Sequence, residues 1–175
     1  MSSAEAASVH ASAVLVGNRA VLIRGPSGAG KSRLAFDLIL AGRAGQIPAC
    51  VLVGDDRVHL EASSGQLLVR PARQLAGLIE IRGLGIFSCG FSPEAIVGLV
   101  VDLAAADAER LPPPQALRAQ IYGIELPRIP AGIGTAPLPL VIAALTMTAI
   151  SSSTHPAGDC PKGFGNHISS TLATE

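Results

Sequence analysis

The stretch from Gly25 to Ser32, GPSGAGKS, constrains the fold of this chain more than any other part of the sequence. It matches G-x-x-x-x-G-K-[ST], a pattern in which glycines let backbone N–H groups surround a phosphate and the following helix adds its positive end. The apolar run at 20–23 precedes the loop, and a helical stripe of apolar residues follows it and ends near Gly42. The sequence therefore predicts a strand, a phosphate-binding loop and a helix.

All residues of this loop are candidates for contact with a nucleotide, namely Gly25, Pro26, Ser27, Gly28, Ala29, Gly30, Lys31 and Ser32. The lysine of such a loop reaches the β- and γ-phosphates, and its serine hydroxyl contacts magnesium. We therefore expect ATP and Mg²⁺ as cofactors, with Lys31 on the phosphates and Ser32 on the metal.

Most other apolar segments are typical of strands. Gly17-Asn18 between two apolar runs predicts a hairpin over 12–23, and the prolines in 121–137 exclude a helix there. Further strands are expected within 49–62, 66–72, 77–89 and 96–104, a proline-rich connection at 107–118, and at 138–150 a core helix that packs on the sheet and buries Met147. Because strands outnumber helices, a mixed, strand-rich sheet fits better than a regular alternation of strand and helix.

The composition excludes several classes of partner. Lys plus Arg and Asp plus Glu both number 13, so no net charge favours nucleic acid or an anionic membrane. No apolar window is long enough for a membrane span, and the N-terminal residues lack the pattern of a signal peptide. Three cysteines without zinc-ligand spacing predict isolated thiols. We therefore expect a cytoplasmic protein that binds neither nucleic acid nor membrane.

Two adjacent carboxylates, Asp55 and Asp56, follow the apolar run VLVG. A phosphate loop usually needs a carboxylate at the end of another buried strand to hold magnesium, often through water. One acid could serve the metal while the other accepts a proton from an incoming hydroxyl, and the sequence does not say which does which. The alternative is a solvated turn, where aspartate is common.

The stretch LIEIRGLGIF at 78–87 predicts a strand that carries Glu80 and Arg82 on the same face. The two side chains could form a structural ion pair on the sheet surface. They could equally serve as a metal ligand and a phosphate clamp. The residue types alone leave both interpretations open.

GPSGAGKS, DDRV and LIEIRGLGI, in this order, resemble HPr kinase/phosphorylase, the bacterial enzyme that acts on a serine of the phosphocarrier protein HPr. The resemblance spans about Val9 to Met147, which corresponds to the C-terminal catalytic domain of that family. It implies a P-loop kinase domain on a mixed, strand-rich sheet, of the HPr kinase and PEP carboxykinase-like type. We expect this domain at 1–150 and a flexible tail at 151–175, as in the short form of alpha-group proteobacteria.

The resemblance also implies a role for each candidate residue. VHASAVLVG resembles the family's catalytic-histidine segment, and ERLP resembles a segment that holds a catalytic arginine. The implied catalytic residues are His10, Lys31, Asp55, Asp56 and Arg110, and the implied magnesium ligands are Ser32, Asp55 and Glu80.

The activity that follows from the resemblance is ATP-dependent phosphorylation of a serine of HPr, which regulates carbohydrate metabolism through the phosphotransferase system. Enzymes of the family are often hexamers, so a homo-oligomer is compatible with this interpretation. The family's phosphorolysis segment is ordinarily basic, whereas PRIPAGIGTAPLPL at 127–140 has Arg128 as its single cation. We therefore expect kinase activity to outweigh phosphorylase activity. The alternatives are a small-molecule or carboxykinase-like enzyme and an ATP-binding regulatory module with weak catalysis.

Overall fold

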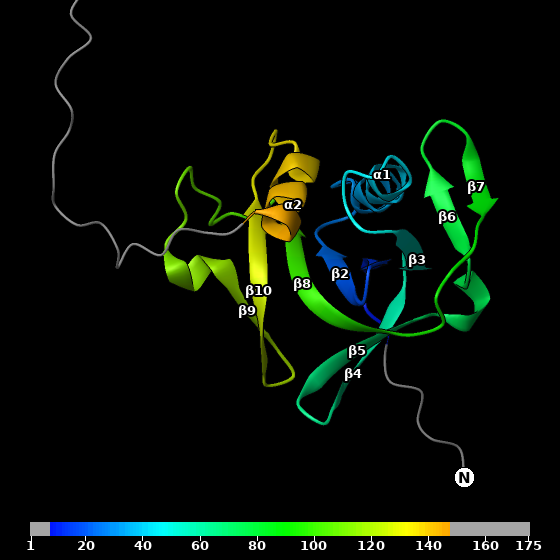
Figure 1. Cartoon of the computed structure of the whole chain (residues 1–175), viewed down its shortest axis with the longest axis horizontal. Coiled ribbons are helices and arrows are strands. Elements are labelled where there is room, and N and C mark those ends of the chain that lie inside the picture. The colour runs from blue at the N-terminus through cyan, green and yellow to red at the C-terminus, as the bar shows by residue number, and fades with distance from the viewer. Residues whose placement is uncertain (1–7, 148–175) are drawn as a thin grey trace, which may run out of the picture.

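A mixed sheet of eight strands forms the centre of this computed structural model, which describes residues 8–147 (Figure 1). The main path through the sheet is β3-β1-β2-β8-β10-β9, while β5 pairs with β8 and β4 pairs with β5. The strands of this sheet are β1 (Ser12–Val16), β2 (Arg19–Arg24), β3 (Cys50–Gly54), β4 (Val58–Ser63), β5 (Gln66–Pro71), β8 (Ala95–Leu103), β9 (Arg118–Ile121) and β10 (Ile124–Ala131). A separate hairpin consists of β6 (Leu78–Ile81) and β7 (Gly85–Ser88).

Three neighbouring strands, β2, β8 and β10, are parallel, and the other pairs of the sheet are antiparallel. The carboxyl ends of parallel strands meet at one edge, where open α/β sheets bind their ligands. At this edge β2 continues into the loop from Gly25, β8 into the loop from Ala104 and β10 into the loop from Gly132. The mixed, strand-rich α/β fold predicted from the sequence is confirmed.

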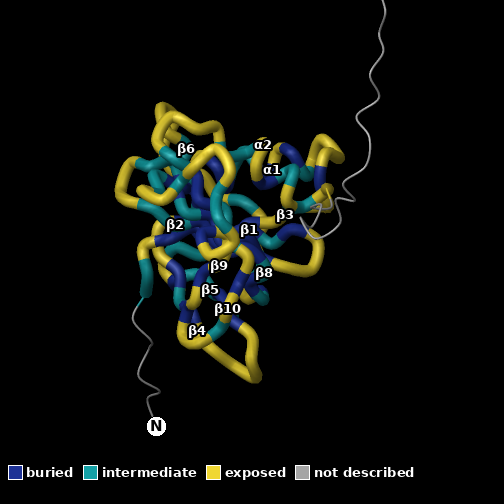
Figure 2. The backbone as a smooth tube through the Cα atoms, turned by 90° about the vertical axis from the view of Figure 1, so that its left-hand side faces the viewer, coloured by how far each residue is buried: buried dark blue, intermediate teal, exposed yellow. Residues whose placement is uncertain are grey.

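The sheet is covered on both faces. Helices α1 (Lys31–Arg43) and α2 (Pro137–Thr146) lie on one face of the central strands. The β4–β5 hairpin, which joins the sheet where β5 pairs with the start of β8, lies on the other face (Figure 1). Because side chains alternate along a strand, Val21 and Ile23 of β2 pack in the cluster beneath the helices, whereas Leu22 packs in the cluster that includes the hairpin. Figure 2 shows that the buried segments run through these central strands. No helix within residues 8–147 is long and apolar enough to cross a membrane.

Most predicted elements are confirmed, including the β1–β2 hairpin, helix α1 and the extended course of β10. The connection at 107–118 contains a short 3-10 helix, η2 (Pro114–Leu117), and a second one, η1 (Arg73–Leu75), follows β5. The predicted tail at 151–175 lies outside the described residues, as do Cys160, His155 and His167.

Two details of the sequence interpretation are wrong. Strand β6 ends at Ile81, so Arg82 lies in the turn that follows, where Leu84 N–H donates to the Ile81 carbonyl at 2.9 Å. Helix α2 forms as predicted, but Met147 is 75% exposed and only Val141 of the helix is fully buried. The reason is that α2 contacts the core through one face, and Met147 is the residue that caps its far end.

Candidate active site

The phosphate loop has the backbone conformation that its glycines predict. Gly25, Gly28 and Gly30 all have positive φ, at 150°, 79° and 97°. A Cβ atom on Gly25 would lie 2.9 Å from the Leu103 carbonyl oxygen, so only glycine fits where the loop leaves β2. Gly30 is the N-cap residue of α1, and no side chain caps this helix. The N–H groups of its first turn are therefore available to an anion.

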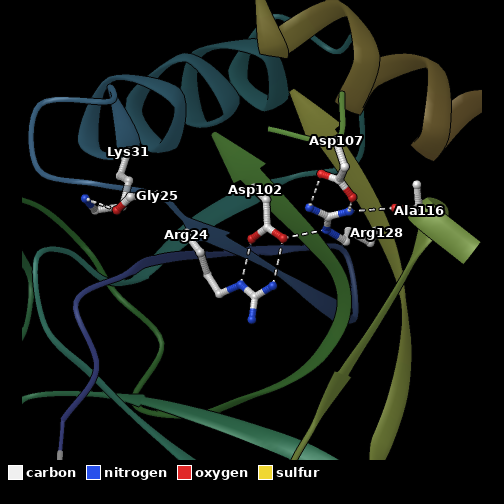
Figure 3. A network of polar contacts seen from close by, with 7 residues as sticks. All are labelled: Arg24, Gly25, Lys31, Asp102, Asp107, Ala116 and Arg128. Atoms are coloured by element: carbon white, nitrogen blue, oxygen red, sulfur yellow. Dashed lines mark hydrogen bonds and ion pairs between the residues drawn. The ribbon is translucent and has the colours of Figure 1, made fainter. Parts of the chain in front are cut away.

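Lys31 is the first residue of α1 and is only 6% exposed. Its Nζ donates a hydrogen bond to the Gly25 carbonyl oxygen at 2.9 Å (Figure 3). It donates another to the Pro26 carbonyl oxygen at 3.0 Å. Burial lowers the pKa of Lys31, and the negative charges of Asp56 and Asp55 partly offset that effect. The ammonium group thus lies within the loop, where it can contact an anion that binds there.

A cleft of about 490 Å³ opens beside the loop. The loop contributes Ser27, Gly28, Gly30, Lys31 and Ser32 to its wall, and α1 contributes the side that includes Phe36 and Leu40. His10, Asp56 and the segment from Glu80 to Arg82 also line the cleft. The structure therefore brings most of the candidate residues together around one cavity.

The two adjacent aspartates face different environments. Asp56 adopts a positive φ of 65°, and its side chain is 64% exposed in the cleft. His10 Nε2 lies 3.1 Å from Asp56 Oδ1. The short pairing of Val9 with Val58 holds the histidine there, next to the turn that carries the aspartate.

Asp55, by contrast, is only 3% exposed and does not line the cleft. Its Oδ1 accepts a hydrogen bond from the Ser12 hydroxyl at 2.5 Å, and its Oδ2 accepts one from the Glu80 backbone N–H at 3.1 Å. Ser12 is fully buried in β1, so Asp55 joins this strand to β6. Its position suits a residue that holds Glu80 in place at the cleft.

Glu80 and Arg82 both line the cleft, although Arg82 lies beyond the end of β6. The hydroxyl of Ser32 and the carboxylates of Glu80 and Asp56 supply oxygen atoms, the ligands that Mg²⁺ prefers. Residues 8–147 contain no group of three or more His, Cys, Asp or Glu residues that could hold a metal ion alone. This donor set fits Mg²⁺ that binds together with substrate phosphates and keeps several waters, as is usual for this ion.

Arg110, the fifth catalytic candidate, lies apart from these residues. It is exposed in the loop that follows β8 and does not line the cleft. The loop nevertheless begins at the same edge of the sheet as the phosphate loop.

Sequence reasoning did not identify a network of charged residues at this edge: Arg24, Asp102, Arg128 and Asp107 (Figure 3). Burial alone would raise the pKa of Asp102, but the hydrogen bonds and charges of Arg24 and Arg128 outweigh it and hold the pKa below its usual value. Hydrogen bonds to Asp107 and Asp102 raise the pKa of Arg128. In the sequence, the network is indicated by Arg24 and Asp102, which each end an apolar run.

The sequence and the fold were compared with those of known proteins. A family model described as the HPr Serine kinase C-terminal domain matches residues 2–133. The HPr kinase/phosphorylase of Mycoplasma mycoides subsp. mycoides is 32% identical over 158 residues, which cover 82% of this chain and 48% of the relative. That of Geobacillus thermodenitrificans is 36% identical over 132 residues, which cover 69% of this chain and 40% of the relative. The chain thus spans about half the length of these relatives or less.

One solved structure is similar over most of its length. The Hpr(Ser) kinase/phosphatase of Coxiella burnetii is 29% identical, with a TM-score of 0.62, and the match covers 79% of this chain and 93% of that one. The motifs, the fold and the family match agree. The chain belongs to the family of the HPr serine kinase C-terminal domain.

Proposed function

We propose that this chain transfers the γ-phosphoryl group of ATP to a serine hydroxyl of the phosphocarrier protein HPr. One observation carries the proposal: the phosphate loop, the His10–Asp56 pair and Glu80 line a single cleft. Family membership supports the acceptor, since the relatives bear the name HPr kinase/phosphorylase. By this proposal the protein regulates carbohydrate metabolism through the phosphotransferase system. It works in the cytoplasm and acts on a protein rather than on nucleic acid or a membrane.

The phosphate loop supplies the binding. Backbone N–H groups of the loop and of the first turn of α1 receive the phosphates, and Lys31 adds a positive charge at the same place. Mg²⁺ would be held by Ser32 and Glu80 and would neutralise negative charge on the phosphates. Asp55 is a candidate metal ligand in the sequence, but both of its carboxylate oxygens accept hydrogen bonds from protein groups. Its proposed role is to hold Glu80 in position.

Asp56 serves as the proton acceptor. It is the aspartate of the pair that faces the cleft, and His10 at 3.1 Å orients its carboxylate. The serine oxygen forms a bond to the γ-phosphorus while the bond from that phosphorus to the β,γ-bridging oxygen breaks. The serine proton passes to Asp56, and the products are phosphoserine and ADP.

Phosphorolysis of phosphoserine should be weak by comparison. Arg128 is the single cation in the segment where the family's basic stretch is expected, and its side chain is 13% exposed. Its guanidinium donates to Asp102, Asp107 and the Ala116 carbonyl. Because these partners already use Nε and both terminal nitrogens, Arg128 has few N–H donors left for an inorganic phosphate. Rapid pyrophosphate release from phospho-HPr and inorganic phosphate would contradict this part.

The test is transfer from labelled ATP in the presence of Mg²⁺, with purified HPr or a mixture of small metabolites as acceptor. We expect label on HPr with the unmodified chain and none with Lys31→Ala, whose fold is checked by circular dichroism. Label on a metabolite alone would favour a small-molecule or carboxykinase-like enzyme. ATP binding without turnover would favour a regulatory module.

The extent of the catalytic domain, 1–150, and its assembly into a homo-oligomer stay predictions. Light scattering of the purified chain measures the mass of the assembly and so tests the homo-oligomer. A mass of one chain at micromolar concentration would contradict it.

A further inference from the structure

Four charged side chains of alternating sign cross the carboxyl edge of the parallel strands: Arg24, Asp102, Arg128 and Asp107 (Figure 3). Each is hydrogen-bonded to the next one. None of them lines the cleft, so the reaction proposed above leaves them without a task. Two positive and two negative charges balance within the network.

The inner end of the network is attached to the phosphate loop. Arg24 is the residue before Gly25, and its Nε and Nη2 donate to the two oxygens of Asp102 at 2.7 and 2.8 Å. The two residues are also register partners in the parallel pair of β2 and β8. Together with the close approach of Gly25 to Leu103, this bidentate pair fixes the start of the loop against the end of β8.

The outer end is attached to the loop that carries Arg110. Arg128 Nε donates to Asp102 at 2.5 Å, and its Nη1 and Nη2 donate to the Asp107 carboxylate at 2.7 and 2.9 Å. The same Nη1 also donates to the Ala116 carbonyl at 2.8 Å. The Arg128 guanidinium therefore binds this loop at two points, Asp107 and Ala116, and Arg110 lies between them in the sequence.

The energetics argue against a purely stabilising role. The side chains of Arg128 and Asp102 are 13% and 15% exposed, so both have lost most of their hydration. Apolar residues of similar volume often stabilise a protein as well as such a buried ion pair, whereas a pair with fixed geometry can hold two segments in one arrangement. Here the two segments are the phosphate loop and the loop from Ala104 to Pro113.

We propose that Asp102 and Arg128 are positioning residues that hold the Arg110 loop in a fixed relation to the phosphate loop. The proposal rests on the proposed function, because the catalytic task of Arg110 is implied by the family resemblance and belongs to that reaction. The inner pair, Arg24 with Asp102, sets the affinity for ATP. The outer pair, Arg128 with Asp107, sets the rate of transfer.

The test severs the outer pair without leaving a buried group alone. Asp107→Ala removes a half-exposed carboxylate, while Arg128 keeps Asp102 and the Ala116 carbonyl. Asp107→Glu is the conservative variant. Glu125→Ala is the matched control, because it breaks the exposed Arg118–Glu125 pair between β9 and β10, which belongs to neither the cleft nor the network.

We expect Asp107→Ala to lower kcat for HPr phosphorylation on the order of tenfold, as misplacement of a catalytic group does, and to leave the Kd of ATP within about twofold. Asp107→Glu should recover part of the rate, and Glu125→Ala should match the unmodified chain. Arg24→Lys keeps the positive charge but loses the two parallel hydrogen bonds to Asp102, so it should instead weaken ATP binding.

Limited trypsin digestion measures how accessible the Arg110 loop is to cleavage, independently of phosphoryl transfer. Cleavage after Arg110 should be faster in Asp107→Ala than in Glu125→Ala under native conditions. Equal cleavage rates and equal kcat values in these two variants would overturn the proposal. If the unmodified chain fails to phosphorylate HPr, the proposed function is wrong, and unchanged cleavage would overturn the positioning role as well.

Discussion

Asp55 and Asp56 are neighbours in the sequence, but their surroundings give them different properties. Asp55 is buried and accepts hydrogen bonds from Ser12 and Glu80, whereas Asp56 faces the cleft beside His10. Asp56, with a positive φ of 65°, lies in the turn between β3 and β4. One residue holds the site together, and the other is accessible to a substrate.

Substitution by asparagine should separate the two roles. Asp56→Asn keeps the shape but removes the proton acceptor, so kcat should fall by about 10²- to 10⁴-fold with little change in stability. Asp55→Asn leaves the buried Ser12 hydroxyl with a weaker partner, and the free energy of unfolding should fall by about 1–3 kcal/mol. Urea unfolding and steady-state kinetics measure the two effects. The reverse pattern would exchange the roles assigned to these residues.

Asp102 gives the protein a predictable dependence on pH. Its pKa in the folded state is lowered despite burial, because Arg24 and Arg128 stabilise the carboxylate. Its contribution to stability is therefore complete above the unfolded-state pKa of about 3.9 and is lost as pH falls through the lower, folded-state value. Thermal melts should show a loss below pH 4 that is smaller in Asp102→Asn. An equal acid loss in both proteins would contradict the assignment.

At the scale of elements, the position of α1 is set by its contacts as well as by the loop before it. Gly42, in the last turn of α1, lies against β3, and a Cβ atom there would be 2.8 Å from the Cys50 backbone nitrogen. This glycine lets the helix approach the strand whose end carries the two aspartates. The distance between the phosphate loop and Asp56 depends on that approach.

Gly42→Ala tests whether this close packing outweighs helix propensity. Alanine is favoured over glycine within a helix by about 1 kcal/mol, but the clash is with backbone that cannot move away cheaply. We expect a net loss of about 1–3 kcal/mol in urea unfolding, typical of overpacking. Gly90→Ala is the control, since a Cβ atom there meets nothing within 4 Å. A stabilised Gly42→Ala variant would show that α1 has room to move.

Local patterns predicted the elements well, because the phosphate loop, the β1–β2 hairpin and β8 depend on nearby residues. The resemblance to HPr kinase/phosphorylase, and not the local pattern, implied that the segment at Glu80 belongs with the loop. What local patterns could not supply was the register between distant segments. Arg24 and Asp102 are separated by 78 positions, and their pairing appears only when β2 lies beside β8. The different faces of Asp55 and Asp56 depend in the same way on β1 and β6.

At the scale of the whole molecule, the carboxyl edge of the three parallel strands carries both the phosphate loop and the Arg110 loop. The phosphate loop leaves this edge from β2, and the Arg110 loop leaves it from β8. The chain spans about half the length of its curated relatives, yet this span includes the cleft and the network.

We propose that the cleft beside Lys31 and Asp56 transfers phosphate from ATP to one serine of HPr. The decisive experiment measures incorporation of label from γ-labelled ATP into HPr and into an HPr variant with alanine at the acceptor serine, with Asp56→Asn as the enzyme control. We expect label on HPr with the unmodified chain, none on the alanine variant, and a rate lower by about a hundredfold or more with Asp56→Asn. Equal labelling of both acceptors, or an unchanged rate with Asp56→Asn, would contradict it.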